Sequence, residues 1–197
     1  DRKDMPVPPK TAIRRHVLPE GLRETPGQGR QESPLTSIDF LGLDDNSTAI
    51  PPDVAGGVGL SHIMTPLNDR YRVQDKSGAV LSTSTATAFW APLPAPSTGH
   101  TDPHVKYDQY ANRWILVAQT TPLTDNYLMV AVSQSNDPTG AWNRYYIKID
   151  IGGPIDTAMD YPLIGYNQNW LVISMNMFNT AGSTNLGTRL YVFDKAN

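Results

Sequence analysis

Two long stretches of the chain share nearly the same residue pattern, and this repeat limits the fold more than any other feature. Residues 102–118 and 160–174 each run from aspartate and proline through a strand, an aromatic, a polar turn and a tryptophan into a second strand. Their leading aspartates, Asp102 and Asp160, are 58 residues apart, and Asp53 precedes the first by 49. A period of about fifty residues built from short strands is typical of β-propeller blades, which bury their faces against one another.

The sequence therefore predicts an all-β fold, a partial β-propeller of about three four-stranded antiparallel blades with an extended N-terminal arm. We place the blades at about 51–90, 102–150 and 160–197, with the last one incomplete and its fourth strand beyond Asn197. Closed propellers have at least about four blades. We therefore expect a second chain, a continuation of the same chain or a homo-assembly to complete the ring, because bare strand edges invite association.

Turn residues separate the expected strands. Asp75–Gly78 has the composition of a hairpin turn, residues 136–140 predict a tight turn, and residues 179–187 predict a long polar loop. The tryptophans Trp114, Trp142 and Trp170 are expected to pack between blades, with an aromatic platform for sugars as the alternative. No strongly amphipathic helical pattern occurs within residues 37–197.

Residues 1–36 differ from the rest of the chain in composition and charge. They contain all three glutamates of the protein and carry a net charge of +2, whereas residues 37–197 carry −5. We interpret them as a flexible or extended arm or linker. Its basic cluster, Arg14, Arg15 and His16, is either a solvated face or a polyanion contact, while the acidic remainder lacks the electrostatic pattern of a nucleic-acid binder.

Several classes of site and segment are excluded by composition. The chain has no cysteine, which excludes disulfides and thiolate zinc sites. No window approaches eighteen consecutive apolar residues, so no transmembrane segment is predicted, and the N-terminus lacks the apolar core of a signal peptide.

Seven short motifs occur along the chain, at residues 52–59, 102–108, 113–114, 130–133, 137–142, 160–162 and 190–195. Together they resemble those of large secreted or cell-surface bacterial proteins whose β-propeller is similar in outline to the arabinanase and sialidase propellers. The resemblance covers residues from about 40 to 197 and implies that the chain is the N-terminal half of a longer propeller, secreted or at the cell surface. The group has no single established activity.

The aspartates Asp53, Asp102 and Asp160 are the candidate ligand-binding residues, together with His104. Each aspartate stands just before the first strand of a blade, and the first strands line a propeller's central channel. Converging carboxylates are ligands for a hard cation, and Ca²⁺ is the candidate cofactor. In the alternative interpretation, each aspartate caps its own turn by accepting backbone N–H groups.

Two further chemistries use the same residues. In an enzymatic interpretation, Asp102 and Asp160 form the carboxyl pair of a glycoside hydrolase with His104 as modulator, and missing blades complete the site. Against it, residues 33–197 contain no glutamate, so no catalytic residue is assigned and we lean away from an enzyme for this chain alone. The pattern His100-x-Asp102-x-His104 is a candidate transition-metal site if alternate residues of a strand share one face.

The function predicted from the sequence is a rigid extracellular binding or structural module. It presents loops to a partner, a glycan or a neighbouring subunit, with a channel-bound cation as an additional feature. The glycoside hydrolase is the alternative.

Overall fold

The computed structural model of the protein describes residues 36–44, 46–93, 99–120, 126–149, 157–179 and 184–196. The chain divides into two units between Ser37 and Ile38, and every element described below lies in the second unit. The predicted N-terminal arm, apart from Thr36, lies outside the described residues.

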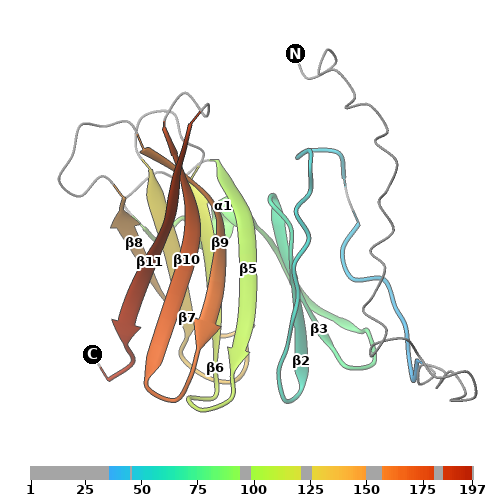
Figure 1. The fold of residues 1–197 in the computed structure, drawn as a ribbon. Coiled ribbons are helices and arrows are strands. Elements are labelled where there is room, and N and C mark those ends of the chain that lie inside the picture. Colours follow the sequence, from blue (N-terminus) through green and yellow to red (C-terminus); the bar gives the residue numbers. More distant parts are fainter. Residues whose placement is uncertain are drawn as a thin grey trace, which may run out of the picture. The chain divides into compact units, whose positions relative to one another are not determined.

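Three antiparallel sheets make up the described part of the chain, which confirms the all-β partial propeller (Figure 1). In each sheet the strands are hydrogen-bonded in chain order, so each is a simple meander. The first sheet contains β1 (Gly57–Val58), β2 (His62–Pro66), β3 (Arg70–Asp75) and β4 (Val80–Thr85). The second contains β5 (His100–Asp108), β6 (Arg113–Thr120), β7 (Tyr127–Ser133) and β8 (Trp142–Lys148). The third contains β9 (Thr157–Tyr166), β10 (Trp170–Asn179) and β11 (Asn185–Asp194).

The second sheet is buried on both faces, and strand β6 shows why. Trp114 and Leu116 belong to one hydrophobic core, shared with Met64 and Tyr71 of the first sheet. Ile115 and Val117 belong to another core, shared with residues of β10. Because successive side chains of a strand point to opposite faces, one continuous apolar run serves both cores.

Local turn chemistry agrees with the sequence at two places and differs at two. Gly78 has φ +92° in the β3–β4 hairpin, and the Gly140 N–H donates to Asp137 O at 3.3 Å in the other tight turn. The loop predicted at 179–187 is shorter, because β10 extends to Asn179 and β11 begins at Asn185. A helix that the sequence analysis did not predict, α1 (Ala86–Trp90), follows β4. Its N-cap Thr85 accepts from the Ala88 N–H.

Trp170, which was predicted to pack between blades, does not pack against another blade among the described residues. Trp114 pairs with Tyr107 and is fully buried, but in the third sheet the residue that pairs with Tyr166 is Leu171. The turn after Tyr166 is shorter than the turn after Tyr107, which shifts the tryptophan by one position along the strand. A one-residue shift moves a side chain to the other face of the sheet. Trp170 consequently lies on the outer face of the third sheet with 44% of its surface exposed.

A test of the close contact between the first two sheets is available at Gly59. A Cβ at this position would lie 2.6 Å from Cζ2 of Trp114 and 3.1 Å from Cδ2 of Tyr107, so the two rings leave no room for a side chain. We expect Gly59→Ala to reduce the free energy of unfolding by about 1–3 kcal/mol through overpacking. Chemical denaturation measures the change.

Gly56→Ala is the matched control, because its Cβ would meet nothing closer than Met64 O at 3.9 Å. Equal stability of the two variants would contradict the packing of Gly59 against Trp114.

Candidate functional site

The first strands of the second and third sheets are each interrupted by a bulge, and the segment before β1 of the first sheet repeats it. In the second sheet, Thr101 pairs with Gln119 and His104 with Val117, so Asp102 and Pro103 together oppose one residue of β6. Asp102 has φ +51°, in the left-handed region that a β-bulge of this kind requires of its first residue. For a residue other than glycine this backbone conformation costs about 1–3 kcal/mol and is found mainly at functional sites.

The other two sheets repeat this bulge. In the first sheet, the Asn68 N–H donates to Pro52 O at 3.0 Å and the Ala55 N–H to Pro66 O at 3.2 Å, and Asp53 between them has φ +47°. In the third sheet, the first bulge residue is Tyr161, with φ +58°. Asp53, Asp102 and Tyr161 are therefore equivalent, and Asp160 stands one residue earlier than the repeated pattern predicted.

A row of amide side chains accompanies these bulges. Gln119 pairs with Thr101, and Asn176 pairs with Asp160. The backbone N–H of Asn68 donates to Pro52 O, so Asn68 stands opposite Pro52 in the same way. All three therefore oppose the residue that immediately precedes a bulge, and the side chain of Asn68 reaches the next blade. The sequence analysis did not identify them. The sequence signal that could have identified them is an amide residue near the end of the second strand of each blade, repeated at nearly the blade spacing.

Asn68 joins the first sheet to the second. Its Nδ2 donates to the Asp53 carboxylate at 2.7 Å and to Pro51 O at 3.0 Å, while its Oδ1 accepts from the Asp102 N–H at 2.7 Å. One side chain thus satisfies the carboxylate of its own bulge and the backbone of the neighbouring bulge. Because Asn68 is 8% exposed, these bonds are largely shielded from water and stabilise the inter-blade contact more than surface bonds do.

Gln119 has the equivalent position in the second sheet, but it bonds only to the carboxylate of its own bulge and not to the backbone of the neighbouring bulge. Its Nε2 donates to the Asp102 carboxylate at 2.5 Å. The backbone N–H of Tyr161 also bonds to that carboxylate, rather than to the glutamine oxygen. The Oε1 atom of Gln119 is buried without a hydrogen-bond partner, which is costly in a protein interior.

The electrostatics of this site centre on Asp102. The main cause of its raised pKa, about 7, is burial, followed by a hydrogen bond to the carboxyl of Asp53 and repulsion from Asp53 and Asp160. The bond from the Tyr161 N–H acts in the opposite direction. These causes together favour the neutral form of the Asp102 carboxyl at the boundary between the first two sheets.

The structure brings some of the predicted site residues together and separates others. Asp53 and Asp102 are within hydrogen-bonding reach, and Asp160 is close enough to repel Asp102. His104 bonds weakly to Asp102 O through Nδ1 at 3.4 Å and contacts the ring of Tyr161 edge-on. None of the three roles proposed for the aspartates is decided by these contacts. The Asp102 carboxylate accepts hydrogen bonds from Gln119 of β6 and from the Tyr161 N–H of β9.

The proposed pair of histidine ligands, His100 and His104, does not form on one face. The bulge at Asp102 reverses the alternation of side chains, so His100 stacks on Trp90 of α1 and His104 points toward Tyr161 of β9. Among the residues that the structure describes, no group of three or more His, Cys, Asp or Glu is arranged to hold a metal ion. Calcium binding by Asp53, Asp102 and Asp160 stays a prediction.

Comparison of the chain with protein-family models, with curated protein sequences and with solved structures found no match. No helix in the described part of the chain has the length and apolar character needed to cross a membrane.

The raised pKa of Asp102 predicts how stability changes with pH. The pKa is about 4 in an unfolded chain and about 7 in the folded one, so the folded protein holds the extra proton between these values. Stability is therefore greatest on the acid side of this window and falls as the pH rises from about 4 to about 7. We expect Asp102→Asn, which keeps a neutral hydrogen-bonding group, to flatten this fall in denaturant midpoints.

Asp75→Asn provides the contrasting control. The pKa of Asp75 is lowered, chiefly by the Ser77 hydroxyl, so this aspartate contributes stability that is lost on acidification. Its replacement should change the profile only below about pH 4. An unchanged slope between pH 4 and 7 in Asp102→Asn would refute the raised pKa of Asp102.

Proposed function

We propose that the chain is an extracellular binding and structural module of the propeller type, whose third sheet receives a further blade. The proposal is carried by the outer face of that sheet. Leu163, Trp170, Leu190 and Val192 are 43%, 44%, 62% and 59% exposed, whereas Ile115 and Val117 on the corresponding face of the second sheet are 2% and 0% exposed. An apolar sheet face of this kind marks an interaction surface.

The occupant that best fits this face is an antiparallel sheet of the same design. Within the chain, the second sheet covers the first and the third covers the second, each through aliphatic and aromatic side chains. Asn176 supports the same occupant, because it repeats the position from which Asn68 accepts the bulge N–H of the next blade. A further blade with the same bulge would bring an N–H group to Asn176.

The first sheet does not need such a neighbour on its outer side. There Arg72 donates to Gly42 O at 2.8 Å and Gln74 to Leu41 O at 3.1 Å, and the ring of Phe40 lies against Gly78. Arg72, Gln74 and the chain's own residues 40–42 occupy part of this side, where Val80 is 55% exposed. The asymmetry is that of a repeat protein with one terminal repeat protected and the other open.

In a preparation of this chain alone, a second copy is the only sheet that can cover the open face. We therefore expect a mass above the 21.7 kDa of one chain in light scattering, increasing with concentration. Leu190→Glu should shift this equilibrium to the monomer, because the charge would be desolvated in the contact.

Val80→Glu is the matched control, since Val80 is 55% exposed on β4 of the first sheet and should leave the association unchanged. A chain that stays monomeric and folded at all concentrations, with the third sheet uncovered, would contradict the proposal.

A second candidate function is hydrolysis of glycosides by acid and base catalysis, favoured by the raised pKa of Asp102 beside the carboxyl of Asp53. A carboxyl group that is protonated near neutral pH is suited to act as a general acid. The distance argues against it, since glycosidase carboxyl groups stand about 5–9.5 Å apart and a hydrogen-bonded pair is closer. Neither cavity described in the structure has Asp53, Asp102 or Asp160 in its lining.

The hydrolase predicts release of a chromophore from aryl glycosides, with a loss of about 10²-fold or more in kcat for both Asp53→Asn and Asp102→Asn. Asp69→Asn is the control, because Asp69 pairs with Arg70 outside the bulges. Turnover that survives both substitutions, or no turnover by the unmodified chain, would exclude this activity for the pair.

A further inference from the structure

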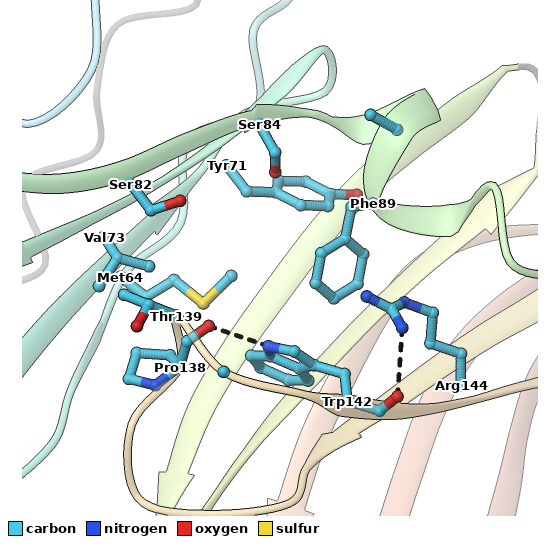
Figure 2. A pocket seen from close by; sticks show the side chains of 12 residues that line it. Met64, Tyr71, Val73, Ser82, Ser84, Phe89, Pro138, Thr139, Trp142 and Arg144 are labelled. Atoms are coloured by element: carbon cyan, nitrogen blue, oxygen red, sulfur yellow. Dashed lines mark hydrogen bonds between the residues drawn. The ribbon is translucent and has the colours of Figure 1, made fainter.

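A cavity of about 230 Å³ lies between the outer strands of the first two sheets, away from the row of bulges (Figure 2). Met64 and Val73 form its apolar base, and the ring of Phe89 projects into it. Figure 2 shows Ser82 and Ser84 along one side, with Trp142 and Arg144 on the other. This volume is below the usual range for drug-sized ligands and suits a single small ring.

Arg144 is the unusual residue of this cavity. Its guanidinium lies 4.5 Å from the centre of the Phe89 ring and donates through Nη1 to Trp142 O at 3.1 Å. Its Nε is buried without a partner, and among the described residues no carboxylate forms an ion pair with it. Burial lowers the pKa of this guanidinium, although arginine stays charged at neutral pH. The guanidinium is partly buried, and removing even part of a cation from water without a counterion is costly unless a ligand supplies the anion.

The rest of the lining specifies what accompanies the anion. The hydroxyls of Ser82 and Ser84 can donate and accept, whereas that of Thr139 donates to the Asp137 carboxylate at 2.7 Å and can only accept from a ligand. Such a lining complements a ligand that carries hydroxyl groups. A simple carboxylate such as acetate would leave the hydroxyls of the lining unused. The apolar base complements the C–H face of a sugar ring, and the guanidinium complements a carboxylate.

We infer that this cavity binds a sugar residue that carries a carboxylate, such as a hexuronate. Arg144 holds the carboxylate, Ser82 and Ser84 contact the ring hydroxyls, and Phe89 fixes the guanidinium by stacking. The inference rests on the proposed binding role of the module and names its ligand. The sugar-binding inference does not depend on the third sheet. The light-scattering test of association and the binding test of the cavity can therefore succeed or fail separately.

Isothermal titration calorimetry with four probes tests the assignment: glucuronate, galacturonate, glucose as the neutral sugar and acetate as the carboxylate without hydroxyls. We expect at least one uronate to bind, and to bind about tenfold or more tightly than glucose and acetate, as a charge-assisted hydrogen bond contributes. A trimer of the preferred uronate distinguishes the source of the bound sugar. Tighter binding of the trimer than of the monomer indicates that the cavity binds the end of an acidic glycan, and weaker binding of the trimer indicates that it binds a free sugar.

Variants assign the effect to the cavity. Arg144→Gln should weaken uronate binding about tenfold or more, and Arg144→Lys should restore only part of it because lysine lacks the planar fork. Ser82→Ala with Ser84→Ala should weaken the uronate severalfold and leave acetate unchanged. Arg113→Gln, at an arginine outside the cavity that donates to Asn112 O at 3.1 Å, is the control and should bind as the original chain does.

Near-ultraviolet circular dichroism shows whether each variant keeps its folded aromatic core, because Phe89 contacts Tyr71, Trp90 and Trp142. Equal binding of glucuronate and glucose, equal binding of glucuronate and acetate, unchanged binding in folded Arg144→Gln, or no uronate binding at about 10 mM would each overturn the inference.

Discussion

The rest of the structure depends on the burial of the second sheet between two neighbours. Strand β6 alternates between the two cores, with Trp114 and Leu116 on one side and Ile115 and Val117 on the other, all of them at most 2% exposed. Burying each such side chain contributes about 1.5–3 kcal/mol, which a single exposed sheet would forgo on one face. The cavity beside Arg144 and the row of bulges both exist because neighbouring sheets are held together by this contact.

The inner strands add a polar connection to this apolar one. Asn68 and Gln119 hold the carboxylates of Asp53 and Asp102, and the backbone of each following bulge bonds back to the sheet before it. This explains how residues other than glycine persist in a left-handed conformation, because strain of this size is kept only where surrounding bonds over-determine it. The aspartates therefore contribute to the joint between blades, whatever ligand they also meet.

The sequence predicted what local patterns control and missed what depends on register. The three sheets, the hairpin at Gly78 and the burial of Trp114 follow from strand alternation and turn residues. The positions of Trp170 and Asp160 were misassigned because the repeats differ by one or two residues in a turn and in the placement of the bulge. Aligning the repeats on their aspartates and tryptophans does not reveal such small differences. Arg144 was not found because its neighbour Phe89 comes from α1, far away in the sequence.

The apolar contact between sheets and the polar connection through the bulges differ in how strictly they select a partner for the open face of the third sheet. An apolar face with Trp170 and Leu190 can be covered by many partners, since hydrophobic contact is not directional. The position of Asn176 is more selective, because its equivalents Asn68 and Gln119 act on a bulge with a fixed backbone geometry. A partner that satisfied only the apolar face would leave this amide without the inter-blade bond that Asn68 makes. A blade carrying the same bulge satisfies both, so specificity for such a blade resides in the polar inner strands and most of the affinity in the apolar face.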